Sequence, residues 1–600
     1  MLNVLNAVKN VRAGNAPDGL SSLPYTDDSP ALNWAIDVAC SNGGDTVVIP
    51  ALQGPVSSGS LPGAGVYRID TTKSVILKSN VDLLFEPGAV LEAIPNDSIA
   101  LTPVVRGDDV SNVSIRGPGL VRGEWDAHMV HQDQFQASVD LYDGDWRLFV
   151  PPPGALSEPV KDAQGSVVSW GDHGMCMVIA QSPPATRNLH TRVYWDFGGS
   201  QWFLDKEAAA SAQLSNALVT PLRGEAGMGV SLHGVVDFVL EGFTVESCWG
   251  DGIFLRGTIN ENGNPLRLSS NGIIRGVTAR RNRRNNLSII DAHNIRVLGG
   301  EYCEAGYPTE IHSAGAPASY QAVVDCGLIG VRCGIDIEPD QDSDRQVHHV
   351  EIAGASAHGN IYDGIHATNH GCWDIEIHDN TCCDNGKEWP SAGSRTRSDH
   401  GSGVHLNRTR AISVYCNECD RNVKGIWISG DSSAAYTSVA YRPAVWGNTC
   451  RENREQGLHV KGHVRGGGFH GNVCILNREE GILLEGETGE NTCVPECVWP
   501  IADCEVSSNT CVGNSHGNAQ EADNMMLTGH CYNNVIRGND LGLWDGKTFA
   551  RHALCIEPKC YRTLVRDNFV KGAGLGPPVI PPEPKDFRDN GKRTDHDHSP

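Results

Sequence analysis

This chain of 600 residues has few aromatic residues, no long apolar run and no excess of basic charge. Aromatic side chains make up 6%, and 48 Lys and Arg stand against 72 Asp and Glu, for a formal net charge of −24. We therefore expect no membrane as a partner, since no apolar stretch reaches spanning length. We expect no nucleic acid either, since phosphate binding needs a basic face. The first residues, MLNVLNAVKNVRAG, also lack the apolar stretch of a signal peptide.

Turn-forming residues, in contrast, are abundant, with 68 Gly and many Asn and Asp. They separate short apolar segments that are typical of strands, such as TVVIP, GVYRI, SVILKS, VDLLFE and AVLEAI. A chain of this length normally divides into several domains, but a solenoid grows in one dimension and escapes that limit. Short strands between frequent turns favour a solenoid.

An internal repeat is the strongest indication of a solenoid. The pattern Asn-x-Cys-x-x-Asn recurs roughly 22 to 40 residues apart, which fits one coil of a β-helix with loop insertions. The five copies are Asn380/Cys382/Asn385, Asn417/Cys419/Asn422, Asn448/Cys450/Asn453, Asn472/Cys474/Asn477 and Asn509/Cys511/Asn514. Most are followed by Gly and alternating apolar residues, as in GVHL, GIWI, GLHV and GILL. We predict an all-β chain folded as a single right-handed parallel β-helix.

The two residue types of the repeat have different expected roles. Asn suits the corner of each coil, because it tolerates left-handed backbone and can bond to the Asn of the coils above and below. Cys at a fixed place in each coil is expected to point inward and to stack as a small apolar residue. We therefore interpret the Cys as buried, reduced and structural, and leave the roles of Cys382-Cys383 and Cys493…Cys497 open.

The N-terminal end is predicted to form a cap at residues 1–50. Its helix is expected from Asp27 to Gly44, with Ser29 as the capping residue and Pro30 at the first helical position. The β-helix is expected over residues 51–572.

Two segments depart from the repeat. A Trp-rich stretch at 125–225 is interpreted as an insertion beside the main body, and its Ala-rich DKEAAASAQLSNAL is typical of a short helix. The insertion either walls one side of a groove or covers a hydrophobic surface. Residues 573–600 are rich in Pro and charge and predict a disordered tail.

Strand alternation predicts which side chains point outward. In the Gly-Ile-x-Ile pattern the two aliphatic residues face the core, while the residue between them and the residue after them face solvent. One expected outward column is Phe254, Ser288, Asp336, His366, His405, Trp427, His459 and Leu483. The neighbouring column is Arg256, Ile290, Glu338, Thr368, Asn407, Ser429, Lys461 and Glu485.

This mixture of carboxylates, imidazoles and an indole suits a carbohydrate site, because rings stack on sugars and ionisable groups move protons. Asp336 and Glu338 lie roughly 6.6 Å apart along one strand, within the range of about 6.5–9.5 Å that lets an inverting glycosidase admit its water. The alternative is a pair of surface carboxylates that bind sugar hydroxyls or face basic residues. We predict catalytic roles for Asp336, Glu338, His366, His405 and Asp251. Asp251 and Asp363 also fit a simpler role, since Asp-Gly is a common turn pair.

Substrate contacts are predicted for three further members of the columns, Trp427, His459 and Lys461. They are also predicted for Arg281, Arg283 and Arg284, which could pair with an acidic sugar or neutralise the nearby carboxylates. No cofactor is expected. A Ca²⁺ site is the alternative for the acidic loop that contains Asp340, Asp342 and Asp344.

The chain resembles the pectin-lyase-like superfamily of right-handed parallel β-helices, including polygalacturonase-like proteins and bacteriophage tailspikes. The resemblance rests on DDSPALNWAIDVACSNGGDTVVIP, GVYRI, GDGIFL, RNRRNNLSII, GIDIEPD and the Asn/Cys repeat, over about 25–100 and 230–570. It implies cleavage or modification of a polysaccharide outside the cell. The Asn-Thr-Asp, Gly-His-Gly and Arg-Ile-Lys motifs of polygalacturonases and the Asp-Pro-His-Asp motif of mannuronan epimerases do not occur, so no catalytic residue is carried over.

Three functions remain open at this stage. The first is a glycoside hydrolase that uses Asp336 and Glu338. The second is a lyase or C5-epimerase in which His366 or His405 takes the proton from a uronate. The third is a glycan-binding or structural tail protein without catalysis. The expected location is a virion tail component, as a homotrimer or with other tail proteins, and otherwise a secreted protein.

Overall fold

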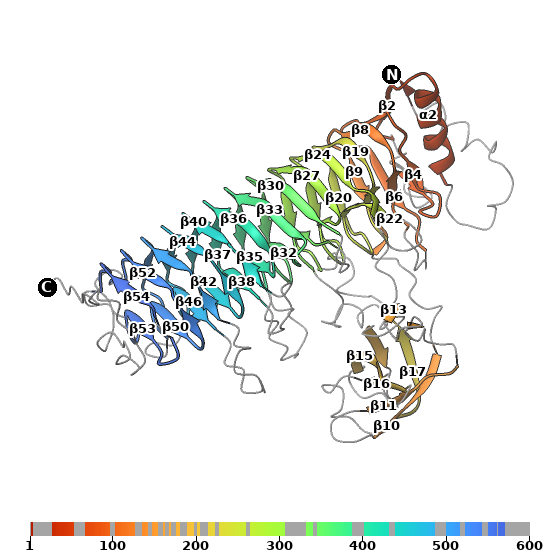
Figure 1. Ribbon diagram of the computed structural model, residues 1–600. Helices are drawn as coiled ribbons and strands as arrows, with labels where there is room; N and C mark the ends of the chain where they lie inside the picture. Colours follow the sequence, from red (N-terminus) through yellow and green to blue (C-terminus); the bar gives the residue numbers. More distant parts are fainter. Residues whose placement is uncertain are drawn as a thin grey trace, which may run out of the picture.

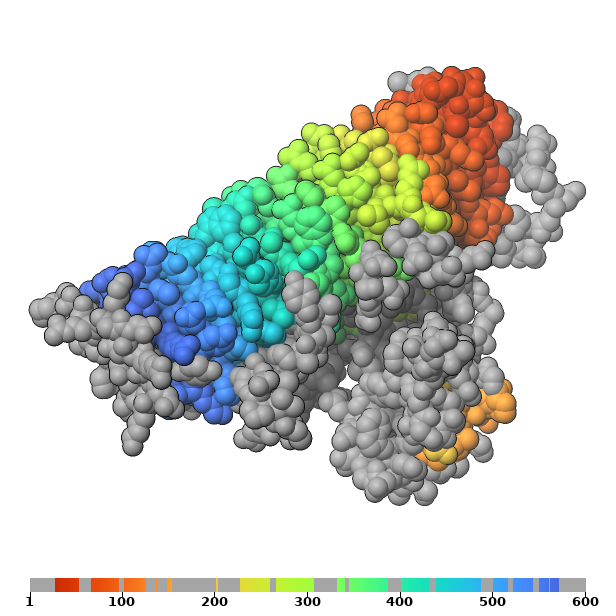
Figure 2. All heavy atoms as spheres, viewed as in Figure 1, coloured from red at the N-terminus to blue at the C-terminus, as the bar shows by residue number. Residues whose placement is uncertain are grey.

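The computed structural model describes the main body of the protein in thirteen segments. They are residues 27–52, 66–96, 102–125, 227–259, 265–306, 332–339, 345–386, 401–430, 439–486, 500–515, 522–542, 550–560 and 562–570. It also describes a strand at residues 2–3 and short strands between 135 and 221. The stacked coils form one elongated rod, with the helix α2 (Ser29–Ser41) at its N-terminal end (Figures 1 and 2).

Three long sheets run along the rod, and successive strands of the chain enter them in turn. The strands of the 13-stranded sheet are β4 (Val75–Ile76), β7 (Val105–Asp108), β18 (Val230–His233), β21 (Ile253–Arg256), β26 (Leu287–Ile289), β29 (Ile335–Ile337), β32 (Ile365–Thr368), β35 (Ser402–Asn407), β38 (Lys424–Ser429), β42 (Leu458–Lys461), β46 (Ile482–Glu485), β50 (Met525–Thr528) and β53 (Leu554–Ile556).

The strands of the 12-stranded sheet are β3 (Tyr67–Ile69), β6 (Val90–Ala93), β9 (Leu120–Arg122), β20 (Thr244–Glu246), β25 (Thr278–Arg280), β28 (Glu301–Cys303), β31 (Ser356–His358), β34 (Thr381–Cys383), β37 (Glu418–Asp420), β41 (Thr449–Arg451), β45 (Val473–Ile475) and β49 (Thr510–Val512).

The third sheet has 19 strands, because several of its coils contribute two short strands. They are β1 (Leu2–Asn3), β2 (Thr46–Ile49), β5 (Asp82–Phe85), β8 (Ser111–Arg116), β19 (Val236–Glu241), β24 (Ser269–Arg275), β27 (Ala292–Leu298), β30 (Val347–Ala353), β33 (Cys372–His378), β36 (Arg410–Tyr415), β39 (Ala440–Tyr441), β40 (Ala444–Trp446), β43 (Val464–Arg465), β44 (Gly468–His470), β47 (Ile501–Ala502), β48 (Glu505–Ser507), β51 (Cys531–Tyr532), β52 (Val535–Arg537) and β54 (Leu564–Arg566).

Within the described residues every pairing in these three sheets is parallel, and each coil passes through the sheets in the same order. Parallel strands that stack coil upon coil define a parallel β-helix. The predicted all-β class and the single right-handed parallel β-helix are therefore confirmed.

The N-terminal helix closes the end of the core, and its inner face is aliphatic. The buried side chains of α2 include Ala31, Leu32, Ala35, Ile36 and Ala39. The predicted capping role of Ser29 is wrong, because Asp28 holds the capping position and Ser29 is already helical. The helix ends before Gly43 and Gly44, whose φ angles of 90° and 105° suit Gly.

The core is built from aliphatic side chains and Cys that recur at the same place in each coil. The repeat Cys are fully buried, namely Cys382, Cys419, Cys450, Cys474 and Cys511. All Cys among the described residues are free thiols. The structure confirms that these Cys fill the core as small apolar residues.

Two buried ladders of Asn run along the rod and join neighbouring coils. In the first, the side-chain amide of each Asn donates to the side-chain oxygen of the next at 2.9–3.0 Å. Its members are Asn380, Asn417, Asn448, Asn472, Asn509, Asn539 and Asn568. The members of the second are Asn360, Asn385, Asn422, Asn453, Asn477 and Asn514.

We expected the Asn residues themselves to adopt the left-handed backbone of the corners. Instead, the residue before each Asn adopts it. Asp379, Cys416 and Ser508 have φ near 55° and precede a ladder Asn directly. The corner is therefore turned one residue earlier, which leaves the Asn side chain free to point along the rod. The role of Asn is the hydrogen-bond ladder and not the turn itself.

The insertion contains antiparallel strands that form a closed barrel. They are β10 (Phe135–Leu141), β11 (Arg147–Val150), β14 (Cys176–Ile179), β15 (Leu189–Asp196), β16 (Gln201–Leu204) and β17 (Leu214–Pro221). The Ala-rich segment ends in strand β17 where we expected helix, because residues 214–221 pair with β10 and β14. Its part at 205–213 and the expected tail at 573–600 lie outside the described residues.

Across the described residues the single helix has 13 residues, too few to cross a membrane.

Replacing Asn417 with Ala is expected to lower the free energy of unfolding by about 3 kcal/mol, because buried donors left without a partner cost about 1–3 kcal/mol each. The Asn417 side-chain oxygen accepts from both the backbone and the side chain of Asn380, at 3.0 Å each. Guanidinium unfolding followed by circular dichroism measures the loss. Asn42→Ala, at an exposed position after α2, is the control, and an equal effect of both substitutions would contradict the role of the ladder.

Candidate functional site

The predicted outward column lies on the 13-stranded sheet, with its members on consecutive coils. The strand pairing places Ser288 beside Asp336, Asp336 beside His366, and His366 beside His405. It continues from His405 to Trp427 and from Trp427 to His459. We call this set the site column; its members are Ser288, Asp336, His366, His405, Trp427 and His459. The predicted register is confirmed.

The expected solvent exposure of the column is wrong. Asp336 is 2% exposed, His366 6% and His405 1%, while Trp427 is half-buried. One reason is that neighbouring side chains cover each other. The ring of His405 stacks between His366, at 4.8 Å between centroids, and Trp427, at 4.0 Å. The side chains project from the outer face of the sheet and pack against one another as a compact polar layer on it.

Asp251 begins a hydrogen-bond network that reaches the column. Its carboxylate is fully buried and accepts hydrogen bonds from the backbone of Asn285, at 3.0 Å, and from Ser288 Oγ, at 2.9 Å. Asn285 Nδ2 then donates to Asp336 Oδ2 at 3.0 Å. The predicted catalytic role of Asp251 conflicts with this burial, since the carboxylate already binds protein donors. Its place supports a role in holding Asn285.

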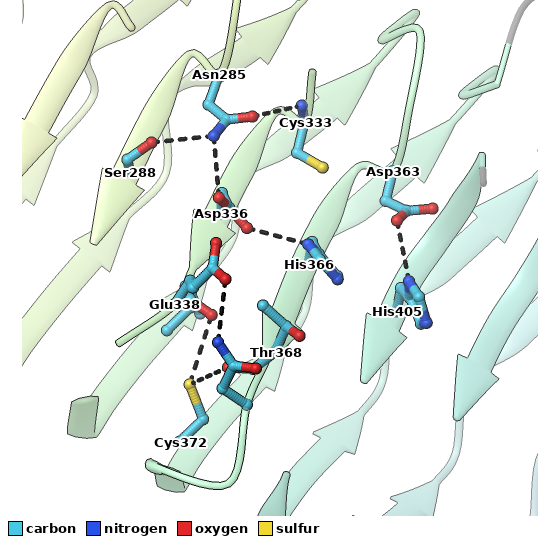
Figure 3. Close-up of polar contacts among 12 residues, drawn as sticks. Asn285, Ser288, Cys333, Asp336, Glu338, Asp363, His366, Thr368, Cys372 and His405 are labelled. Atoms are coloured by element: carbon cyan, nitrogen blue, oxygen red, sulfur yellow. Dashed lines mark hydrogen bonds and ion pairs between the residues drawn. The ribbon is translucent and has the colours of Figure 1, made fainter. Parts of the chain in front are cut away.

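Asp336 and His366 form a carboxylate–imidazole pair (Figure 3). Asp336 Oδ1 lies 3.0 Å from His366 Nδ1, while Asn285 occupies the other carboxylate oxygen. Burial lowers the pKa of His366, but the hydrogen bond and the negative charge of Asp336 outweigh it, so the pKa is raised above its ordinary value. Among the described residues, His366 Nε2 has no hydrogen-bond partner although it is buried. A buried nitrogen of this kind needs a polar partner such as a water or a ligand hydroxyl.

A second carboxylate–imidazole pair lies on the next coil. Asp363 Oδ2 is 3.1 Å from His405 Nδ1, and His405 Nε2 is 3.1 Å from Ser429 Oγ. Asp363 Oδ1 accepts from the backbone of Gly401 and Ser402, at 2.9 and 2.6 Å. His405, predicted to be catalytic, therefore has both ring nitrogens bound within the protein.

The column continues toward the C-terminal end with an indole, an amine and an imidazole. The Lys424 amine lies 4.9 Å from the centre of the Trp427 ring and 2.6 Å from the Glu455 carboxylate. His459 Nε2 lies 3.0 Å from Glu485 Oε2, and burial lowers the pKa of His459. Lys461 lies 3.6 Å from the same carboxylate and is 44% exposed, so it is open to a ligand.

Glu338 is the accessible carboxylate of the pair that we predicted. It is half-buried and accepts a hydrogen bond from Asn369 Nδ2 at 3.0 Å. Glu338 directly follows β29, two residues after Asp336, so the structure brings the two predicted carboxylates together with His366 (Figure 3). Their environments differ, because Asp336 is buried and Glu338 is partly open.

The arginine run is bound to protein groups. The Arg283 guanidinium is buried, 4.0 Å from the centre of the Trp249 ring. Arg281 pairs with Glu304 at 2.6 Å, and Arg284 lies 3.7 Å from Asp251. The predicted substrate contact of Arg283 is wrong, because stacking on Trp249 removes its guanidinium from the surface. Pairing with protein carboxylates is the observed role of Arg281 and Arg284.

Three buried side chains beside the column have the donor types of a metal site. One ligand atom each of Cys333, Asp363 and His366 lies within 4.8 Å of the others. However, His366 Nδ1 is bonded to Asp336, and Asp363 already accepts three hydrogen bonds. His366 Nδ1 and the Asp363 carboxylate are therefore already engaged by residues outside this group. Asp340, Asp342 and Asp344, the expected Ca²⁺ loop, lie outside the described residues.

Sequence reasoning missed the residues that hold the column in place. They occupy one position, three residues before each column member, and include Asn285, Asp363 and Lys424. The repeat indicates these positions, because the residues three positions before the members of the site column are also aligned from coil to coil. Which of them bond to the column depends on side-chain orientation, which the repeat does not contain.

No family model matches the chain, and no curated protein matches it either. Among solved structures it is similar to the A-module of the mannuronan C-5 epimerase AlgE4 from Azotobacter vinelandii, with 12% identity, 97% of this chain and 98% of that chain covered, and a TM-score of 0.40. It is also similar to a tailspike protein of E. coli bacteriophage HK620 in complex with a pentasaccharide, with 13% identity, 95% and 78% coverage, and a TM-score of 0.47. The periplasmic alginate epimerase AlgG gives 10% identity, 82% and 76% coverage, and a TM-score of 0.36. These likenesses concern the parallel β-helix fold alone.

The raised pKa of His366 predicts a pH-dependent contribution to stability. A His whose folded pKa lies above its unfolded value of about 6.5 stabilises the fold fully at lower pH and loses this effect as the pH rises through the folded pKa. The difference in free energy of unfolding between the wild type and His366→Gln should therefore shrink from pH 6 to pH 9.

His463 offers a control of opposite sign, since burial lowers its pKa to about 4. Relative to His463→Gln, the wild type should lose stability as the pH falls from 6.5 to 4. Chemical unfolding of the wild type and of each variant across its pH range measures both differences in the free energy of unfolding. A His366 difference that grows with rising pH would contradict the Asp336–His366 pair.

Proposed function

We propose that this protein is an enzyme that degrades a polysaccharide by hydrolysis on the outer face of the 13-stranded sheet. The observation that carries the proposal is the grouping of Asp336 and His366 on two adjacent strands, with Glu338 directly after the first strand and Trp427 two coils beyond His366. An aromatic ring that can stack on a sugar beside ionisable groups that can move protons suits a glycan better than a peptide or a nucleic acid.

In this mechanism Glu338 gives a proton to the leaving glycosidic oxygen, and a water attacks the anomeric carbon from the other side. His366 takes the proton of that water through Nε2. Asp336 keeps the proton on Nδ1 and stabilises the imidazolium, as a buried carboxylate does for a general-base imidazole. Asn285 fixes Asp336 in turn. Asp336 is thus assigned a positioning role in place of the direct proton transfer that we expected from the sequence.

A uronate lyase or C5-epimerase is the second candidate. The Asp336–His366 pair favours it, because an imidazole with a raised pKa can take a proton from the carbon next to a carboxylate. We rank hydrolysis first, because two carboxylates, Asp336 and Glu338, lie together beside His366. A non-catalytic glycan-binding tail protein, alone or as a homotrimer, is the third candidate, and its expected location is a virion tail.

Incubation with a panel of neutral and uronate polysaccharides tests the proposal. Glu338→Gln and His366→Ala should each lower kcat by about 10²-fold or more, the usual loss when a general acid or base is removed. New reducing ends without absorbance near 235 nm indicate hydrolysis. Glu376→Gln, an exposed carboxylate on the 19-stranded sheet, is the matched control and should leave kcat unchanged. Unsaturated product would replace the hydrolase with the lyase, and binding without any turnover would leave only the binding protein.

Trp427→Ala should raise KM about 10-fold and change kcat little, because stacking binds the sugar without taking part in proton transfer. Initial rates over a range of substrate concentrations separate the two constants. Trp446→Ala, at a 37% exposed Trp on the 19-stranded sheet, is the control. An unchanged KM in Trp427→Ala would remove this residue from the substrate contacts.

A further inference from the structure

The outer face of the 12-stranded sheet carries a column of alternating charge. Strand pairing aligns Arg68, Glu92, Arg122, Glu246 and Arg280 on consecutive coils. Each neighbouring pair forms an ion pair: Arg68 pairs with Glu92, Arg122 lies 3.0 Å from both Glu92 and Glu246, and Arg280 lies 2.9 Å from Glu246. The column thus follows one rule over five coils.

The alternation of Arg and Glu stops at the next three coils. There the same column holds Cys303, His358 and Cys383, aligned in that order. Their strand neighbours Tyr302, Ala357 and Cys382 belong to the core, so the three side chains lie on the outer face. Two thiols on either side of an imidazole replace the ion pairs. Cys383, whose role the sequence left open, is therefore not a member of the buried Cys stack.

A carboxylate completes the group. Glu301 lies two residues before Cys303 on the same face of β28, and its Oε1 is 3.0 Å from His358 Nε2. One ligand atom each of Glu301, Cys303 and His358 lies within 4.8 Å of the others. Thiolate, imidazole and carboxylate are together the ligands that Zn²⁺ prefers, whereas Ca²⁺ and Mg²⁺ prefer oxygen alone.

We propose that Cys303, His358 and Glu301 bind a divalent transition-metal ion of the Zn²⁺ type as three protein ligands, which leaves a fourth position for water. On binding, Cys303 releases its thiol proton to solvent and bonds the ion as a thiolate. The side chains of Glu301 and His358 are 46% and 37% exposed, so the ion reaches the site from solvent.

The surrounding charges permit a cation at this place. The two arginines nearest in the chain, Arg280 and Arg281, are engaged by Glu246 and Glu304. The ion would join β28 and β31 on adjacent coils and so stabilise the stack by mass action. The site lies on a different sheet from the site column, so the inference is independent of the proposed function.

Titration of the full, chelator-treated chain with Co²⁺ tests the site, because Co²⁺ bound to thiolate gives a near-ultraviolet charge-transfer band. We expect a thiolate band that saturates near one equivalent and is lost on addition of Zn²⁺. Cys303→Ser should abolish the band, and His358→Ala should weaken Co²⁺ binding at least 10-fold. Cys416→Ser, at an exposed Cys outside the cluster, should leave it unchanged.

Thermal unfolding gives a second measurement that does not depend on the spectrum. Zn²⁺ should raise the unfolding temperature of the wild type and of Cys416→Ser, but not that of Cys303→Ser or His358→Ala. Circular dichroism first establishes that both variants keep the fold, and Glu301→Gln serves as a milder third variant. Two results would overturn the proposal: absence of the band in the wild type, or a band as strong as that of the wild type in both Cys303→Ser and His358→Ala.

Discussion

Hydrogen bonding from one coil to the next is the constraint on which the rest of this structure depends. Backbone bonds between parallel strands set the spacing of the coils, and the two buried Asn ladders hold the corners in the same register. Because an amide has both a donor and an acceptor, each Asn can satisfy the coil below and the coil above at once. A slip of one residue in any coil would turn its apolar side chains outward and break both ladders.

Fixed register has a consequence on the outside of the rod. Residues that occupy the same position in successive coils lie next to one another and form a row along the rod. On the 12-stranded sheet this yields the alternating ion pairs from Arg68 to Arg280. On the 13-stranded sheet it yields the stack of His366, His405 and Trp427, in which Asp336 and Asp363 each hold one imidazole. The same geometry that builds the core therefore positions the groups that do chemistry.

The repeat carried enough information to predict the fold and the register of the site column. The Gly-Ile-x-Ile pattern of the strands indicates which residues face the core. Alignment of successive repeats places Asp336 beside His366, and His366 beside His405. The sequence did not reveal burial, because it does not show that stacked rings cover one another. Nor could it reveal that Arg283 stacks on Trp249 or that Asn285 bonds to Asp336, since both contacts depend on side-chain orientation between coils.

The most direct test of the proposed site is a crystal structure of Glu338→Gln with an oligosaccharide fragment of a polysaccharide that the wild type cleaves. We predict sugar density over β29 to β42, with a glycosidic oxygen beside residue 338 and a ring against Trp427. Well-ordered sugar bound on another sheet, with this face empty, would contradict the account.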